Sequence, residues 1–166
     1  MKPNITGIVG GVLAFVSLAL PWWTITASAW GMTFSADMYL YQVSDLPSSL
    51  GIPVEQGWFM WLALVLVLFS GLLGIVGSLK LDSKGLLGGG ILALLSVIIF
   101  AVGLQIQLST AEMTLGLFSS GEGYLTYLSF GFWIALVAAI VMFVASRKKP
   151  AEAAAFPPPP PPPAVY

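Results

Sequence analysis

Four long stretches without a charged residue constrain the fold of this chain more than any other feature. They cover about residues 5–23, 58–79, 86–108 and 125–146. A helix needs roughly 20 mainly apolar residues to cross the hydrocarbon core of a bilayer, and each stretch is of that order. Charged residues make up 8% of the chain, whereas they make up about 25% of an ordinary soluble domain. The sequence therefore predicts an integral membrane protein with four membrane-spanning helices.

The basic residues all flank one side of these predicted helices. They are Lys2, Lys80, Lys84, Arg147, Lys148 and Lys149. The two longer connections, residues 24–57 and 109–124, contain acidic residues but no Lys or Arg. Because short connections rich in Lys and Arg stay in the cytoplasm, we expect both termini to be cytoplasmic and the two longer connections to be outer loops. The predicted location is the plasma membrane, which the chain crosses several times.

A cleaved signal peptide is the competing interpretation of the first stretch, because Ala27-Ser28-Ala29 resembles a cleavage site. However, Trp22, Trp23 and a β-patterned segment separate the apolar stretch from that site. We therefore expect the first stretch to be retained as a helix.

The first outer loop has the period of a β-hairpin. Polar and apolar residues alternate over residues 24–30 and again over residues 33–41, which is typical of strands, and Gly31 between them suits a turn. Residues 44–57 leave room for one short strand, and residues 114–118 of the second outer loop are another candidate. The side chains of the first loop that we expect to contact other molecules are Trp30, Phe34, Met38, Tyr39 and Tyr41.

Small residues recur at helical spacing along the predicted helices. In a membrane such residues let helix backbones approach closely. The predicted packing positions are Gly7, Gly11, Gly71, Gly74, Gly77, Gly85, Gly89, Gly131 and Ala135. A short turn over residues 81–83 joins the second and third helices, so we expect this pair to be antiparallel and to pack most tightly. Aromatic and basic residues at the helix ends suit the membrane interface, and the predicted anchors are Trp22, Trp23, Trp58, Trp61, Arg147, Lys148 and Lys149.

The sequence offers no set of residues for catalysis or metal binding. It has no His and no Cys, which removes imidazole and thiol chemistry. The carboxylates of the outer loops lack the spacing of a calcium loop. We therefore expect no enzyme activity and no cofactor or metal, and the net charge of -1 gives no reason to expect a nucleic acid partner. Gln105 is the most notable polar residue in the helices, where it could bond to another helix or line a shallow outer cavity.

The segment 150–166 ends in a run of prolines, Pro157–Pro163. Such a run favours the polyproline II conformation and cannot form a core. It is either a stiff, solvated cytoplasmic tail or a ligand for the aromatic groove of a cytoplasmic partner.

The end of the first apolar stretch carries a local motif, Ala19-Leu20-Pro21-x-Trp23-x-Ile25-Thr26-Ala27. It resembles the end of the first helix and the start of the first extracellular segment in claudins and related peripheral-myelin-protein-like tetraspan proteins. Over about residues 1–149, this resemblance implies four helices, cytoplasmic termini and β-strands in both outer loops. The claudin first loop also carries Gly-Leu-Trp and a cysteine pair. In this chain, Trp30-Gly31-Met32 resembles Gly-Leu-Trp only in part, and there is no cysteine. The expected fold is a membrane all-α four-helix bundle with a small extracellular β-hairpin or β-sheet.

Three functions remain open at this point. The leading hypothesis is a non-enzymatic tetraspan protein that acts in protein–protein interaction or adhesion, with other membrane proteins or with copies of itself, and with membrane lipid around it. The alternative is an accessory structural subunit of a larger respiratory or cell-envelope complex. A small channel or transporter is the third, and it requires a wet cavity that reaches Gln105.

Overall fold

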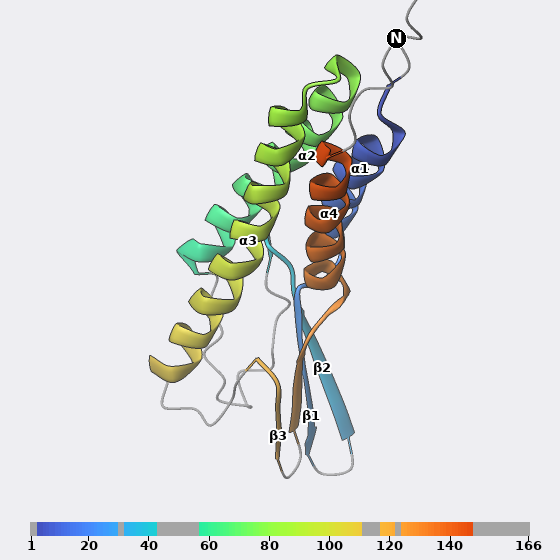
Figure 1. Ribbon diagram of the computed structural model, residues 1–166. Coiled ribbons are helices and arrows are strands. Elements are labelled where there is room, and N and C mark those ends of the chain that lie inside the picture. Colours follow the sequence, from blue (N-terminus) through green and yellow to red (C-terminus); the bar gives the residue numbers. More distant parts are fainter. Residues whose placement is uncertain (1–2, 30–31, 43–56, 111–116, 122–123, 148–166) are drawn as a thin grey trace, which may run out of the picture.

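The computed structural model describes residues 3–29, 32–42, 57–110, 117–121 and 124–147. This part of the chain forms a helix bundle from which a small sheet projects (Figure 1). In chain order the elements are α1 (Ile5–Leu18), β1 (Trp23–Ala29), β2 (Met32–Met38), α2 (Trp58–Lys80), α3 (Ser83–Thr110), β3 (Ser119–Gly121), β4 (Tyr124–Leu128) and α4 (Phe130–Arg147).

The helices pack in a ring of neighbours, α1 against α2 and α4, and α3 against α2 and α4. The most extensive contact is between α2 and α3, as the short turn between them predicts. That turn lies at one end of the bundle and the sheet lies at the other (Figure 1). Lys80, Lys84 and Arg147 belong to the end that carries the turn, which we call the basic end.

Three helices are long and apolar enough to span a membrane, namely Trp58–Lys80, Ser83–Ser109 and Phe130–Arg147. Large apolar side chains cover their outer surfaces, among them Phe69, Ile98 and Ile140. A soluble protein would leave such surfaces in water at a high cost. These features are consistent with a multi-pass membrane protein.

Helix α1 is shorter than the sequence predicts. It has 14 residues and ends at Leu18, so the predicted helical range 5–23 is wrong over its last five positions. The reason is local, because the N–H groups of Ala19 and Leu20 bond back to Val16 and Ser17 and close the last turn, while Pro21 has no N–H to continue it. Trp23 already belongs to β1.

The four described strands form one antiparallel sheet with the order β2-β1-β4-β3. The hairpin predicted in the first outer loop is confirmed, and its register pairs Trp23 with Met38 and Ala29 with Met32. The predicted strand at 114–118 is wrong at its end, because β3 begins only at Ser119, and residues 114–116 lie outside the described part. The short strand expected within residues 44–57 falls almost wholly outside it.

Strand β4 was not predicted. The helix expected to begin near residue 125 begins at Phe130, because Tyr124–Leu128 pairs with β1 instead. Thr126 and Leu128 are buried while Leu125 and Tyr127 are exposed, which is the alternation of a half-buried strand. As a result, the helix-then-strand segment α1–β1 lies antiparallel to the strand-then-helix segment β4–α4, with α1 against α4 and β1 paired with β4.

Candidate interaction surface

The sheet is fixed to the helices by Trp22, the residue before β1. Its side chain is fully buried and packs edge-on against Phe100 of α3, with ring centroids 5.1 Å apart, and Phe132 of α4, at 6.0 Å. Its Nε1 donates a hydrogen bond to the Ser17 carbonyl of α1 at 2.9 Å. One indole therefore ties three helices together at the point where the sheet begins.

Backbone hydrogen bonds complete this junction. The Trp22 N–H donates to the Met38 carbonyl at 2.8 Å, and the Gly131 N–H donates to the Pro21 carbonyl at 2.8 Å. Gly131 has no room for a side chain, since a Cβ there would lie 2.5 Å from Trp22 Cδ1 and 2.7 Å from the Leu20 carbonyl oxygen. The first residues of α4 and the chain leaving α1 are thus in direct backbone contact.

The tryptophans predicted as membrane anchors divide into two groups. Trp22 and Trp23 are 0% and 1% exposed, so the prediction that they face the membrane interface is wrong, because the sheet and helices enclose them. Trp58 and Trp61, at the start of α2, are 73% and 53% exposed, as an interfacial position requires. Arg147 is exposed in the last turn of α4, and the predicted anchors Lys148 and Lys149 lie outside the described residues.

The predicted small residues lie where helices meet. Gly11 and Gly74 face each other between α1 and α2, and Gly77 lies against Gly85 and Leu86 of α3. Ser70 adds a hydrogen bond from its Oγ to the Gly89 carbonyl at 2.8 Å, from α2 to α3. The remaining predicted positions also lie at contacts between elements or in the core, and they are Gly7, Gly71, Gly131 and Ala135.

The two faces of the sheet differ. One face carries Trp23, Ile25 and Met38, which are buried in the same hydrophobic cluster as Leu104 and Leu108 of α3. We call it the packed face. The opposite, open face carries Thr33 and Ser35, which are exposed.

Short polar contacts join β1 and β2 on the open face. Thr24 Oγ1 donates to Asp37 Oδ1 at 2.7 Å, and the hydroxyls of Ser28 and Thr33 lie 3.4 Å apart. These cross-strand contacts hold the hairpin in a single register.

The predicted contact residues of the first loop occupy different environments. Met38 is 1% exposed and belongs to the core, so it is not a contact residue, because the even-numbered positions of β2 turn toward the packed face. Phe34 and Tyr39 are partly exposed and Tyr41 is exposed, and the rings of Tyr39 and Tyr41 lie 5.6 Å apart just beyond β2. Trp30 lies outside the described residues.

Strand β2 is an edge of the sheet within the described part of the chain. In an antiparallel sheet, successive residues direct their backbone groups to one neighbour and then to the other. The Met38 carbonyl of β2 accepts the Trp22 N–H at 2.8 Å, so Met38 directs its backbone groups toward β1. The Trp22 carbonyl, just before β1, accepts the Ser129 N–H at 3.0 Å in register with the β1–β4 ladder, so within β1 the odd-numbered residues bond to β2. Their partners on β2 have even numbers. The backbone N–H and C=O of Thr33 and Ser35 therefore point away from β1.

Sequence reasoning placed Thr126 in the fourth helix and missed its role in the sheet, where it joins β3 to β4 by accepting a hydrogen bond from the Ser119 N–H at 3.0 Å. The polar Thr126 between Leu125 and Tyr127 could have indicated a strand. However, these residues adjoin the apolar residues of α4, so the sequence there also fits the start of the helix. Gln105 is exposed and lines a shallow depression of about 270 Å³ whose other lining residues are apolar.

Among the described residues, no group of three or more His, Cys, Asp or Glu side chains could hold a metal ion. The sheet projects from the end of the bundle (Figure 1), and in the described part of the chain β2 forms one of its edges. No family model matches the chain, and no curated protein matches it.

Proposed function

We propose that this chain is a non-enzymatic, multi-pass membrane protein that associates with a second copy of itself through the edge of its outer sheet. In this proposal β2 of one copy pairs with β2 of the other, and the bundle is claudin-like in architecture. The observation that carries the proposal is the edge strand β2, whose Thr33 and Ser35 direct backbone hydrogen-bonding groups away from the sheet.

The composition of β2 supports strand pairing. Natural proteins usually protect exposed edges with Lys, Pro or inward-pointing charges. The seven residues of β2, MTFSADM, include no Pro and no basic residue. Their one charge, Asp37, accepts a hydrogen bond from Thr24 within the sheet. The edge therefore carries little that would repel another strand.

The strand is also compatible with itself. A two-fold axis through Ser35 gives antiparallel pairing of all seven residues, and it sets Asp37 opposite Thr33 of the second copy rather than opposite another Asp37. Like charges directly opposite each other destabilise a strand pair, so this register avoids the one electrostatic conflict that β2 could produce.

The junction supports membrane insertion of the short α1 segment. Fourteen residues of helix rise only about 21 Å, less than the roughly 30 Å hydrocarbon core. Backbone groups in lipid must be hydrogen-bonded within the protein. Ala19, Leu20 and Trp22 each donate to a protein carbonyl, and Pro21 has no donor, so the non-helical continuation of the crossing carries no unpaired backbone N–H.

The absence of native cysteine allows a clean test. A Ser35→Cys variant in oxidising conditions should form a disulfide-linked dimer in membranes, because directly opposed residues of paired strands lie within disulfide reach. The control is Ser120→Cys, also an exposed serine, on β3 at the opposite edge, which should stay monomeric. Equal cross-linking of both variants, or of neither, would contradict pairing through β2.

A proline variant separates association from folding. Because the Ser35 N–H points away from β1, Ser35→Pro removes no hydrogen bond within the sheet and should abolish the dimer while the monomer stays folded. Phe34→Pro removes a bond to β1 and should destabilise the sheet itself. Native mass spectrometry in mild detergent reads the outcome. If a different protein co-purifies in a fixed ratio and the chain itself stays single, the chain is an accessory subunit and the self-pairing proposal fails.

A further inference from the structure

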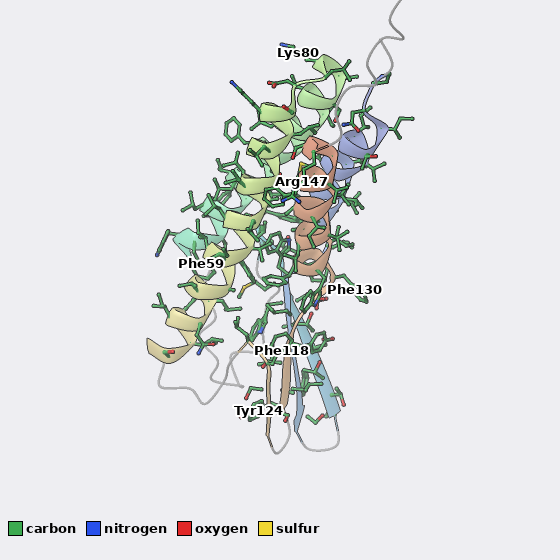
Figure 2. The ribbon with its side chains drawn as sticks, viewed as in Figure 1. Phe59, Lys80, Phe118, Tyr124, Phe130 and Arg147 are labelled. Carbon is green, nitrogen blue, oxygen red and sulfur yellow. The ribbon has the colours of Figure 1, made fainter. Side chains whose placement is uncertain are left out.

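A groove at the basic end lies between the first turn of α3 and the last turn of α4. It has a volume of about 420 Å³ and is lined by Ser83, Lys84, Leu87, Phe143, Ser146 and Arg147. Figure 2 shows Arg147 near the end of α4, with Lys80 at the same end of the bundle and Tyr124 in the sheet at the other. The groove therefore lies far from the sheet edge.

The groove is polar at its mouth and apolar along its wall. Lys84 and Arg147 contribute two positive charges from two different helices, and Ser83 and Ser146 contribute hydroxyls. Leu87 lies one turn further into α3 and is 45% exposed, and the Phe143 ring packs against Gly90 of the same helix. A ligand that fits this arrangement carries a negative charge next to an apolar portion.

None of the described residues that line the groove carries a carboxylate. Asp82 directly precedes Ser83 in the chain, and its Oδ1 accepts a hydrogen bond from the Lys84 N–H at 3.0 Å. The charge of the lining side chains is therefore positive. A basic pocket between helices at headgroup depth is the kind of site that holds the phosphate of an anionic lipid.

We propose that this groove binds one anionic phospholipid, with its phosphate between Lys84 and Arg147 and an acyl chain along Leu87 and Phe143. The charge complementarity and the apolar wall both support a lipid rather than a small anion. The proposal rests on the membrane placement proposed above, but it does not depend on strand pairing, since the two surfaces lie at opposite ends of the bundle.

The test uses the full chain in mild detergent with an equal mixture of phosphatidylglycerol and phosphatidylcholine. These lipids share a phosphodiester and differ in net charge, and native mass spectrometry measures which is retained. The wild-type chain should retain phosphatidylglycerol preferentially. Lys84→Gln and Arg147→Gln should each lower that preference roughly five-fold, because one basic residue near a membrane surface contributes about 1 kcal/mol.

Lys80→Gln is the matched control, because Lys80 is exposed at the same end but does not line the groove. It should leave the preference unchanged, and an equal loss in this variant would reduce the effect to general surface charge and overturn the site. Phe143→Ala should weaken retention of the long-chain lipid.

Two further outcomes would overturn the proposal. Displacement of the lipid by excess inorganic phosphate would assign the groove to a free anion. A marked rise in lipid retention after removal of residues 150–166 would instead assign the groove to the tail of the chain. Cross-linking at Ser35 should be the same in all groove variants, so failure of the lipid site and failure of strand pairing are distinguishable.

Discussion

At the scale of single residues, two adjacent tryptophans have the same burial but different hydrogen bonding. Trp22 Nε1 donates to the Ser17 carbonyl, whereas Trp23 Nε1 is buried and has no acceptor among the described residues. A buried donor without a partner costs about 1–3 kcal/mol, and a typical intramolecular hydrogen bond contributes about 1 kcal/mol. The two indoles should therefore differ in their contribution to stability.

Substitution by phenylalanine tests this difference. At both positions it removes the indole N–H and the same amount of side-chain volume. We expect Trp22→Phe to destabilise the protein by at least about 1 kcal/mol more than Trp23→Phe, since only the first loses a hydrogen bond. Thermal unfolding of both variants in the same detergent provides the comparison. Equal losses would mean that Trp23 Nε1 finds its acceptor outside the described residues.

At the scale of elements, α1 packs against α4 and β1 pairs with β4, and the chain is in close backbone contact at Gly131 where these two contacts meet. Gly131→Ala should lower stability by about 1–3 kcal/mol, the usual cost of overpacking, because the new Cβ would overlap Trp22 Cδ1 and the Leu20 carbonyl oxygen. Gly88→Ala is the matched control within α3, where the nearest atom to a new Cβ is Leu73 Cδ1 at 3.7 Å. That change should be neutral or stabilise the helix by up to about 1 kcal/mol. A similar loss at both glycines would contradict the tight junction.

The elements also show which features local sequence could predict. The β1–β2 hairpin follows from alternation on both sides of Gly31, so its signal lies entirely within about twenty residues. Strand β4 depends on pairing with β1, roughly one hundred residues earlier in the chain, and its five apolar and polar residues merge with α4 in any hydropathy profile. The burial of Trp22 and Trp23 depends on the same pairing, which explains why tryptophans typical of an interface lie in the core.

The two candidate sites also differ in how far local sequence predicts them. The exposed edge of β2 follows from the predicted hairpin, although sequence alone does not show which strand flanks β1 on its other side. The groove at the basic end requires Lys84 and Arg147 to meet across the α3–α4 contact. The sequence does not indicate that these two residues are close in space, because their contact depends on how the whole bundle packs.

At the scale of the whole molecule, the two ends of the bundle differ in charge, and this difference predicts its orientation. The described sheet and its connections contain no Lys or Arg, whereas Lys80, Lys84 and Arg147 all lie at the basic end. The positive-inside rule therefore predicts that the basic end is cytoplasmic. Since both ends carry exposed serines and the chain has no native cysteine, single cysteines can report the side of the membrane.

We expect Ser120→Cys in the sheet to react with a membrane-impermeant maleimide in intact cells. Ser83→Cys at the start of α3 should react only after the cells are permeabilised, because the two positions lie at opposite ends of the bundle (Figure 1). Labelling of both variants after permeabilisation controls for accessibility of the thiols. The reversed pattern would refute the cytoplasmic placement of the basic end, and it would put the sheet edge β2 inside the cell. Labelling of both positions in intact cells would refute membrane spanning by α3, the helix that joins the basic end to the level of the sheet.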